Sequence, residues 1–186
     1  MGRPILRRGK SVSLGIHVRE EIPEMYSEFA DFEVQRFLGR PDRLYTLDSE
    51  YEWFESIPKK EDMRVLAILL NRKNSSGRQG HDHLLIGNIG IHLIDRVSSK
   101  AEIGYLLFRK YWGRGYGTEA VSLVVDYAFQ TLNLRKLTAR VFEPNGASSA
   151  VLMKNGFRLA GRLREHQYIN SIGYVDELYY ELHRGS

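Results

Sequence analysis

The sequence of 186 residues contains no cysteine. This absence excludes disulfides, thiolate metal sites and a cysteine nucleophile, so any group transfer must use another nucleophile or pass directly from donor to acceptor. No apolar run reaches about 18 residues, so we expect no membrane span. Residues 1–8 are basic, but no apolar stretch follows them, which argues against a secretory signal and favours a cytoplasmic location.

Signals for a metal or for nucleic acid are also weak. The six histidines follow no ligand spacing, and His81 and His83 fall in a segment that we predict to be a polar loop. The formal charge of +4 suits phosphate ligands, but ordinary surface lysines and arginines explain it equally well. There is no arginine-rich tract and no aromatic ribonucleoprotein signature. We therefore expect neither a metal nor a nucleic-acid partner.

Hydrophobic periodicity predicts a mixed α/β domain. It predicts seven strands, at residues 11–18, 65–70, 84–94, 101–108, 136–142, 157–164 and 174–182. It predicts helices over residues 20–38, with a restart at Asp31, and over 47–54, 118–132 and 147–154, with a polar loop at 71–83. This order argues for a mixed sheet flanked by helices. We expect one domain over residues 1–183 and interpret residues 184–186 as an expression-tag remnant.

A glycine-rich loop, residues 112–117, lies between a predicted strand and a predicted helix. Gly113, Gly115 and Gly117 remove side chains where backbone amides would approach an anion, and the helix start favours a phosphate. Arg114 can add charge-assisted contacts. A dinucleotide fingerprint would need glycine at Thr118, and no Walker sequence occurs. A tight turn that only connects two elements remains an alternative.

The segments around this loop resemble a known family. Residues 102–108 read Glu-Ile-Gly-Tyr-Leu-Leu-Phe and residues 111–120 read Tyr-Trp-Gly-Arg-Gly-Tyr-Gly-Thr-Glu-Ala. With residues 145–148 (Asn-Gly-Ala-Ser), 154–157 (Lys-Asn-Gly-Phe), 163–165 and 173–176, they resemble GNAT N-acetyltransferases of the RimJ/RimL-type branch. Trp112 departs from the family's usual glutamine or arginine at that position.

The resemblance implies a mostly antiparallel, twisted sheet that is splayed in the middle to hold acetyl-CoA. The pantetheine arm would pair with the strand that ends near residues 106–108, and an amide near Leu107 would stabilise the oxyanion. Leu106 and Phe108 could instead have a role in the core, and the two roles are compatible. The expected acetyl-CoA contacts are Leu106, Leu107, Phe108, Trp112, Gly113, Arg114, Gly115, Tyr116, Gly117, Thr118, Asn145, Ser148 and Lys154.

The same resemblance implies the proton-transfer groups. Glu102 is the first candidate for the general base, with an exposed or ion-paired strand carboxylate as the alternative; Glu165 is a second candidate, although Gln167 aligns better with the family's catalytic carboxylate. The tyrosine that many family members use to protonate the leaving thiolate is replaced here by Leu152. Ser148 matches the serine that RimL-like enzymes use instead, and helix capping is its alternative role.

The identity of the acceptor is the property that the sequence indicates least clearly. The resemblance implies transfer to a primary amine in a ternary complex, and a protein N-terminus is slightly favoured over a polyamine, an amino sugar or an antibiotic. Tyr51, Trp53 and Phe54 either form a wall of the substrate pocket or pack in the core. A non-catalytic acyl-CoA-binding module is the alternative from another functional class, and a homodimer is compatible with the sequence.

Overall fold

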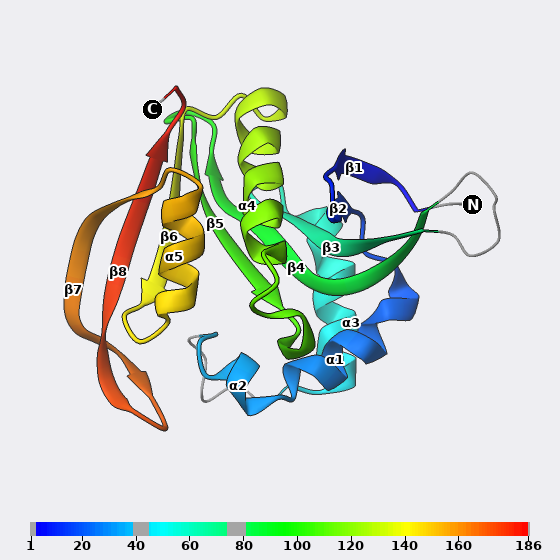
Figure 1. Cartoon of the computed structure of the whole chain (residues 1–186), viewed down its shortest axis with the longest axis horizontal. Helices are drawn as coiled ribbons and strands as arrows, with labels where there is room; N and C mark the ends of the chain where they lie inside the picture. The colour runs from blue at the N-terminus through cyan, green and yellow to red at the C-terminus, as the bar shows by residue number, and fades with distance from the viewer. Residues whose placement is uncertain (1–2, 39–44, 74–80, 186) are drawn as a thin grey trace.

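The computed structural model describes residues 3–38, 45–73 and 81–185. Its sheet has eight strands in the order β1-β2-β3-β4-β5-β6-β8-β7, and every neighbouring pair is antiparallel except β5 and β6 (Figure 1). The strands are β1 (Ile5–Arg8), β2 (Val12–Gly15), β3 (Arg64–Lys73), β4 (His81–Asp95), β5 (Lys100–Leu107), β6 (Lys136–Phe142), β7 (Arg158–Ile169) and β8 (Gly173–His183).

The helices of the described residues are α1 (Ile22–Phe29), α2 (Phe32–Gln35), α3 (Leu47–Ser56), α4 (Tyr116–Asp126) and α5 (Gly146–Lys154), with 3-10 turns η1 (Arg19–Glu21), η2 (Ile57–Lys59) and η3 (Arg109–Tyr111) and a π-helical turn η4 (Tyr127–Thr131). Three of these five α-helices, α2, α3 and α5, begin at a residue whose side chain caps them. The Asp31 side chain caps α2, which confirms the predicted restart, and Thr46 forms a capping box with Ser49 at α3.

Two predictions at the start of the sheet were wrong. Strand β1 was missed because four residues with two arginines carry little apolar signal, although β1 pairs with β2. The predicted loop at residues 71–83 is shorter, since Asn71 pairs with His83 and Lys73 with His81 in the β3–β4 ladder. His81 and His83 therefore belong to a strand. Residues 74–80 of that segment lie outside the described residues.

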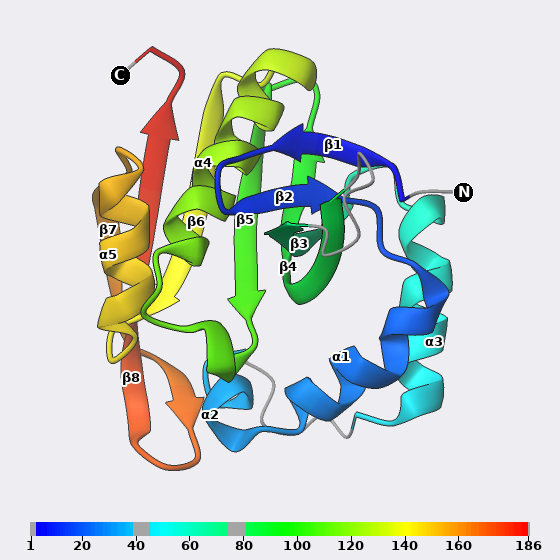
Figure 2. The ribbon, with the colours of Figure 1, turned by 45° about the vertical axis from the view of Figure 1, so that its right-hand side comes forward.

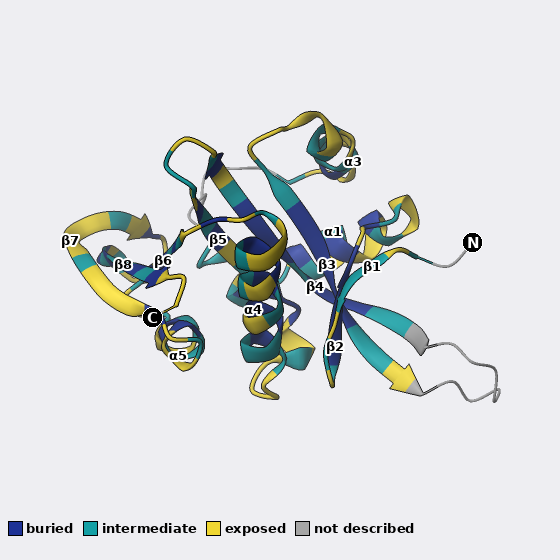
Figure 3. Cartoon of the chain, turned by 90° about the horizontal axis from the view of Figure 1, so that it is seen from above, coloured by how far each residue is buried: buried dark blue, intermediate teal, exposed yellow. Residues whose placement is uncertain are grey.

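Helices cover both faces of the sheet. Helices α4 and α5 lie on one face, and α1 and α3 lie on the other (Figures 2 and 3). The larger core lies under α4, where Val121 and Val124 pack with Ile89 and Ile91 of β4. A second core joins Met25 and Phe29 of α1 to the opposite face. The two cores bury both faces of the central strands, and the ends of these strands remain available to form a site.

A bulge in β4 sets which side chains face each layer. The register shifts by one residue between Ile68 and Leu69 of β3, so that Ile86 and Ile89 of β4, three residues apart, both pack with the α4 core. Gly87 follows the bulge, and an added Cβ there would lie 2.1 Å from the Leu106 carbonyl oxygen. A glycine is required at this position because β4 passes so close to the backbone of β5.

The middle of the sheet is splayed as the resemblance implied. The parallel strands β5 and β6 pair only over Lys100–Lys136, Ala101–Leu137 and Glu102–Thr138. Beyond Glu102 the two strands separate (Figure 1). Phe108 N donates to Ile86 O at 2.9 Å. By the antiparallel alternation, the amide and carbonyl groups of Tyr105 and Leu107 face the gap instead of β4.

No helix in the described part of the chain is long and apolar enough to span a membrane.

Candidate functional site

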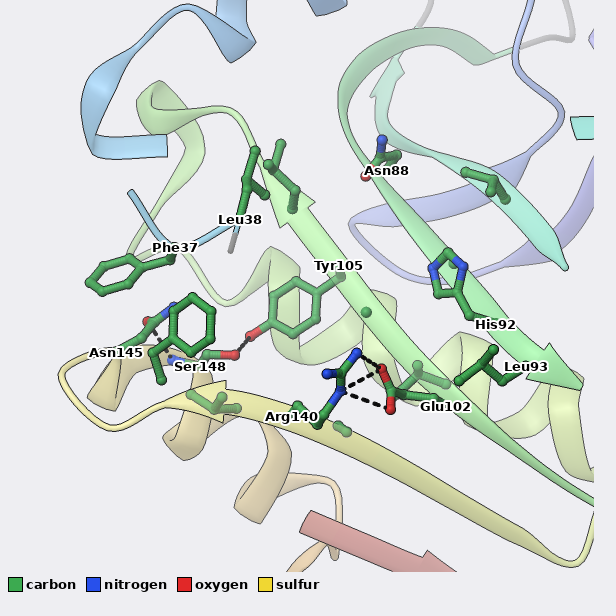
Figure 4. A pocket seen from close by; sticks show the side chains of 18 of the residues that line it. Phe37, Leu38, Asn88, His92, Leu93, Glu102, Tyr105, Arg140, Asn145 and Ser148 are labelled. Carbon is green, nitrogen blue, oxygen red and sulfur yellow. Dashed lines mark hydrogen bonds and ion pairs between the residues drawn. The ribbon is translucent and has the colours of Figure 1, made fainter. Parts of the chain in front are cut away.

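A pocket of about 810 Å³ lies where β5 and β6 separate. Its wall includes residues from α1, α3, β4, β5, β6, α5, β7 and β8, so it draws on most of the described chain (Figure 4). The chemically active lining residues are Glu50, Asn88, His92, Glu102, Tyr105, Arg140, Asn145, Ser148, Gln167 and Glu177. The cleft therefore gathers polar groups from distant parts of the sequence.

The floor of the pocket is a trough formed by β4 and β5. Three cross-strand pairs form it: Asn88–Leu106, Gly90–Gly104 and His92–Glu102. The central pair has no side chains, so the floor is lowest between the polar pair and the splayed end. The His92 ring extends back along β4 and lies over Gly90. A Cβ added at Gly90 would be only 2.1 Å from His92 Nε2.

Glu102, the predicted base, is bound to Arg140 of β6. Arg140 Nε donates to both carboxylate oxygens at 3.0 Å, and Nη2 lies 2.9 Å from Oε1. The hydrogen bond to Glu102 is the main cause that raises the pKa of Arg140. Glu102 therefore has the ion-paired arrangement that was the alternative to a role as the base.

Glu177 of β8 is a site residue that was not predicted from sequence. Its side chain is only 2% exposed, and Arg140 Nη1 lies 3.5 Å from Oε1. Tyr179 donates to Glu177 Oε2 at 3.1 Å, and His166 Nε2 lies 3.6 Å from the same oxygen. Burial is the first cause that raises the pKa of Tyr179. The sequence did carry a signal for this residue, because Glu177 falls at an inward-facing position in the alternating pattern of β8.

Two hydroxyl groups meet on the α4 side of the gap. Tyr105 donates to Ser148 Oγ at 3.3 Å (Figure 4). Burial raises the pKa of Tyr105, against the opposing effect of the bond to Ser148. Asn145, not Ser148, caps α5, since Asn145 Oδ1 accepts from Ser148 N at 3.2 Å. Leu152 is buried one turn later, so Tyr105 is the phenol that lies beside Ser148.

The glycine-rich loop has the backbone that glycine allows. Gly113 has φ 71° and Gly115, the N-cap of α4, has φ 81°, both in the left-handed region. Gly117 is buried, and an added Cβ would lie 3.4 Å from both Leu107 and the Tyr105 ring. The first amides of α4 have no acceptor within their own helix. Arg114 is exposed beside them and has no ion pair with the described residues.

Trp112 ties this loop to the end of β5. Its Nε1 donates to Leu107 O at 2.7 Å, so this carbonyl, which faces the gap, already has a partner. The Leu107 amide remains available to a ligand in the gap. Phe108 does not suit the predicted role in acetyl-CoA binding. Its side chain is fully buried, its amide donates to Ile86 O and its carbonyl accepts from Tyr111 N, both at 2.9 Å. Phe108 has the core role that was its alternative.

The remaining predicted contacts surround the start of α4. Thr118 O accepts from Asn155 Nδ2 at 3.1 Å, which joins α4 to the end of α5. Tyr116 packs against the larger core, and Lys154 is exposed in the last turn of α5. Glu119, which follows the glycine-rich loop, has a structural role, since its Oε1 accepts from Ser11 N at 2.9 Å.

The other candidates divide between the pocket and the surface. Glu165 is exposed on the edge strand β7, and its amide donates to Asp176, whereas Gln167 lines the pocket. Trp53 and Leu106 line the pocket as well, while Tyr51 and Phe54 pack against the α1 core. No group of three potential metal ligands occurs among the described residues.

Comparison with known proteins identifies a family. Residues 16–158 match the family model described as the acetyltransferase (GNAT) domain. The chain is 40% identical over 164 residues to the uncharacterized N-acetyltransferase YoaA of Bacillus subtilis, covering 86% of each chain. Two relatives named for their acceptors match over shorter segments. These are the Escherichia coli ribosomal-protein-serine acetyltransferase, 31% identical over 46% of this chain and 48% of the relative, and the spermidine N(1)-acetyltransferase of the same species, 35% identical over 41% of each.

The fold is shared with solved structures. The spermidine N-acetyltransferase of Vibrio cholerae, solved in complex with CoA and spermine, aligns with a TM-score of 0.81 over 94% of this chain and 96% of that one. The sequence identity is 18%, so this likeness concerns the fold alone.

Proposed function

Because this chain belongs to the GNAT acetyltransferase family, we propose that it acetylates a primary amine of a cationic, polyamine-like molecule. The observation that carries this acceptor class is the charge of the pocket. Its described lining holds the carboxylates of Glu102 and Glu177 against the single guanidinium of Arg140. An excess of negative charge in a partly enclosed cleft attracts a cation and raises its local concentration.

The chain is an acetyl-CoA-dependent N-acetyltransferase. We assign the phosphates of acetyl-CoA to the loop of Gly113, Arg114 and Gly115, because positive φ angles and free helix-start amides suit an anion there. The rest of the contact set is Leu106, Leu107, Trp112, Tyr116, Gly117, Thr118, Asn145, Ser148 and Lys154. Phe108 leaves the set, since its side chain and backbone are all used within the fold.

The splayed gap suits direct transfer between the two substrates. The acceptor side is the trough of β4 and β5, and the thioester side is the gap lined by Tyr105 and Ser148. The Leu107 amide faces this gap and is the donor available for the oxyanion, whereas the Phe108 amide is bonded to Ile86. The chain has no cysteine, so a thiol-bound acyl intermediate is excluded.

We assign stabilisation of the leaving thiolate to the Tyr105–Ser148 hydroxyl pair. The bond of 3.3 Å holds both groups on the thioester side. A thiol with a cysteine-like pKa of about 8.5 is more acidic than a phenol whose pKa is raised above its usual value. The proton therefore stays on Tyr105, and the pair stabilises the thiolate by hydrogen bonding.

A protein N-terminus, the acceptor slightly favoured from sequence, is the second candidate. The name of the ribosomal-protein-serine acetyltransferase supports it, as the name of the spermidine acetyltransferase supports a polyamine. The two acceptors differ chemically. An α-amino group has a pKa of about 8, whereas an alkyl amine of pKa near 10.4 is neutral in only about one molecule in 2,500 at pH 7.

The test is the rate of thiol release from acetyl-CoA with spermidine, with spermine and with a short neutral peptide that carries a free α-amine. We expect kcat/KM for the polyamines to exceed that for the peptide by about tenfold or more, equivalent to about 1.4 kcal/mol. Preference for the peptide would overturn the polyamine assignment in favour of the second candidate. Tight CoA binding with no turnover on any amine would overturn the assignment of both acceptors.

A further inference from the structure

We infer that His92 is the general base of the reaction and that the charge of Glu102, its partner across the β4–β5 ladder, tunes it. This inference rests on the proposed function and adds a catalytic residue to it. His92 lies on the acceptor side of the sheet, opposite Glu102 in the β4–β5 ladder (Figure 4). Its ring makes no hydrogen bond or ion pair with the described residues, so its nitrogens are free to meet the acceptor.

The glycine pair directs the ring toward the reacting atoms. His92 Nε2 would lie 2.1 Å from an added Cβ at Gly90 and 4.0 Å from one at Gly104. The ring therefore extends along β4 over the bare floor, toward the end where Asn88 and Leu106 lie beside the splayed gap. An amine bound beside the ring, over Gly104 and toward Leu106, would have Nε2 on one side and the thioester on the other.

The competing carboxylates are already engaged. Both oxygens of Glu102 accept hydrogen bonds from Arg140, and Glu177 is buried against Tyr179 and Arg140. Burial is the first cause that lowers the pKa of His92, opposed by the charges of Glu102 and Asp62 and assisted by Lys60 and Arg140. His92 is consequently neutral at pH 7, the form that accepts a proton.

The proton and bond changes balance with His92 in this role. The acceptor loses one proton to water, and the neutral amine nitrogen attacks the thioester carbonyl carbon and forms the C–N bond. The nitrogen then carries a positive charge, and one of its protons passes to His92 Nε2 as the C–S bond breaks. His92 then releases that proton to water and the thiolate takes a proton from water, leaving the amide, free thiol and neutral imidazole.

The test compares kcat/KM as a function of pH, from about pH 5 to 9, for the wild type, His92→Gln and Glu102→Gln with spermidine as acceptor. For the wild type, log(kcat/KM) should rise with a slope of about 2 below the pKa of His92 and about 1 above it, since both amine and imidazole must be neutral. His92→Gln should lose about 100-fold and show a slope of about 1 throughout. Glu102→Gln should keep the change of slope but move it to lower pH, because a charge that raises the pKa of His92 is gone.

Two further variants separate chemistry from folding. Free imidazole should restore turnover to His92→Ala, and all His92 variants should bind CoA as the wild type does. His183→Gln, at the exposed end of β8, is the matched control and should keep the wild-type profile. An unchanged profile in His92→Gln, or loss of the slope change in Glu102→Gln alone, would overturn the inference while leaving the proposed function intact. A wild type that acetylates no amine would overturn both.

Discussion

At the scale of residues, the site separates two chemical tasks onto the two faces of the sheet. Alternation along β5 sends Glu102 to the acceptor face and Tyr105 to the face that carries α4 and α5. In the proposed reaction, a polar group on one face meets the amine and a hydroxyl on the other meets the departing sulfur. The splay lets the two substrates meet through the sheet.

Substitution of Tyr105 tests the thioester face. Tyr105→Phe keeps the ring that packs 3.4 Å from the Gly117 Cβ position but removes the hydroxyl beside Ser148. We expect kcat to fall by about 100-fold, at the low end for loss of one hydrogen-bond donor to a developing negative charge. Calorimetric titration should give an unchanged Kd for CoA. A wild-type kcat in Tyr105→Phe would contradict the assignment.

His17 makes stability depend on pH. Burial is the first cause that lowers its pKa from 6.5 to about 4; the charge of Arg3 assists, and the backbone of Leu66 opposes the shift. The unfolded chain binds this proton at higher pH than the folded chain, so the contribution of His17 to stability is constant above about pH 6.5 and falls between about pH 6.5 and 4. The loss is about 3 kcal/mol, from 1.36 kcal/mol per pKa unit.

Denaturant unfolding of the wild type and His17→Leu at a series of pH values measures this effect. The difference in unfolding free energy between them should change by about 3 kcal/mol over that interval, in favour of the variant at low pH. His183→Leu, at a half-exposed histidine, should follow the wild type. Parallel curves for the wild type and His17→Leu would contradict the account.

At the scale of elements, the loop between β5 and α4 depends on backbone conformation more than on side chains. Gly113 and Gly115 occupy the left-handed region, and Trp112 fixes the loop to the Leu107 carbonyl. A side chain would meet nothing within 4 Å at either glycine, so space is not the constraint. The constraint is the φ angle, which sets the direction of the backbone amides in this loop.

Gly115→Ala tests this constraint. Left-handed backbone costs an L-residue about 1–2 kcal/mol, so we expect a melting temperature lower by a few degrees and roughly tenfold weaker CoA binding. Gly161→Ala is the matched control, because its added Cβ also meets nothing within 4 Å and its φ is not positive. Equal CoA affinity in the two variants would show that the loop tolerates a side chain at residue 115.

Local signals predicted most elements well. Strand β6 has the predicted bounds, and α5 differs by one residue at its start, because periodicity and capping act over a few neighbours. The glycine loop was also recognisable, since its sequence is contiguous. The Arg140–Glu177 contact, the Tyr105–Ser148 bond and the position of His92 were not, because each joins strands or helices far apart in sequence.

At the scale of the whole molecule, one interruption of the sheet creates the function. Seven of the eight strands were expected from sequence, the splay between β5 and β6 was expected from the resemblance, and β1 at the edge was the addition. The pairing of β5 and β6 ends after three residues, which opens the pocket between two packed cores. Both substrates can therefore be bound at once.

The central claim is direct transfer of the acetyl group between two substrates bound together in this gap. Initial rates with acetyl-CoA and spermidine both varied test it most directly. Double-reciprocal plots should give intersecting lines, as a ternary complex requires. Parallel lines, the kinetic signature of a covalent acyl-enzyme, would contradict direct transfer and point to acylation of a residue such as Ser148.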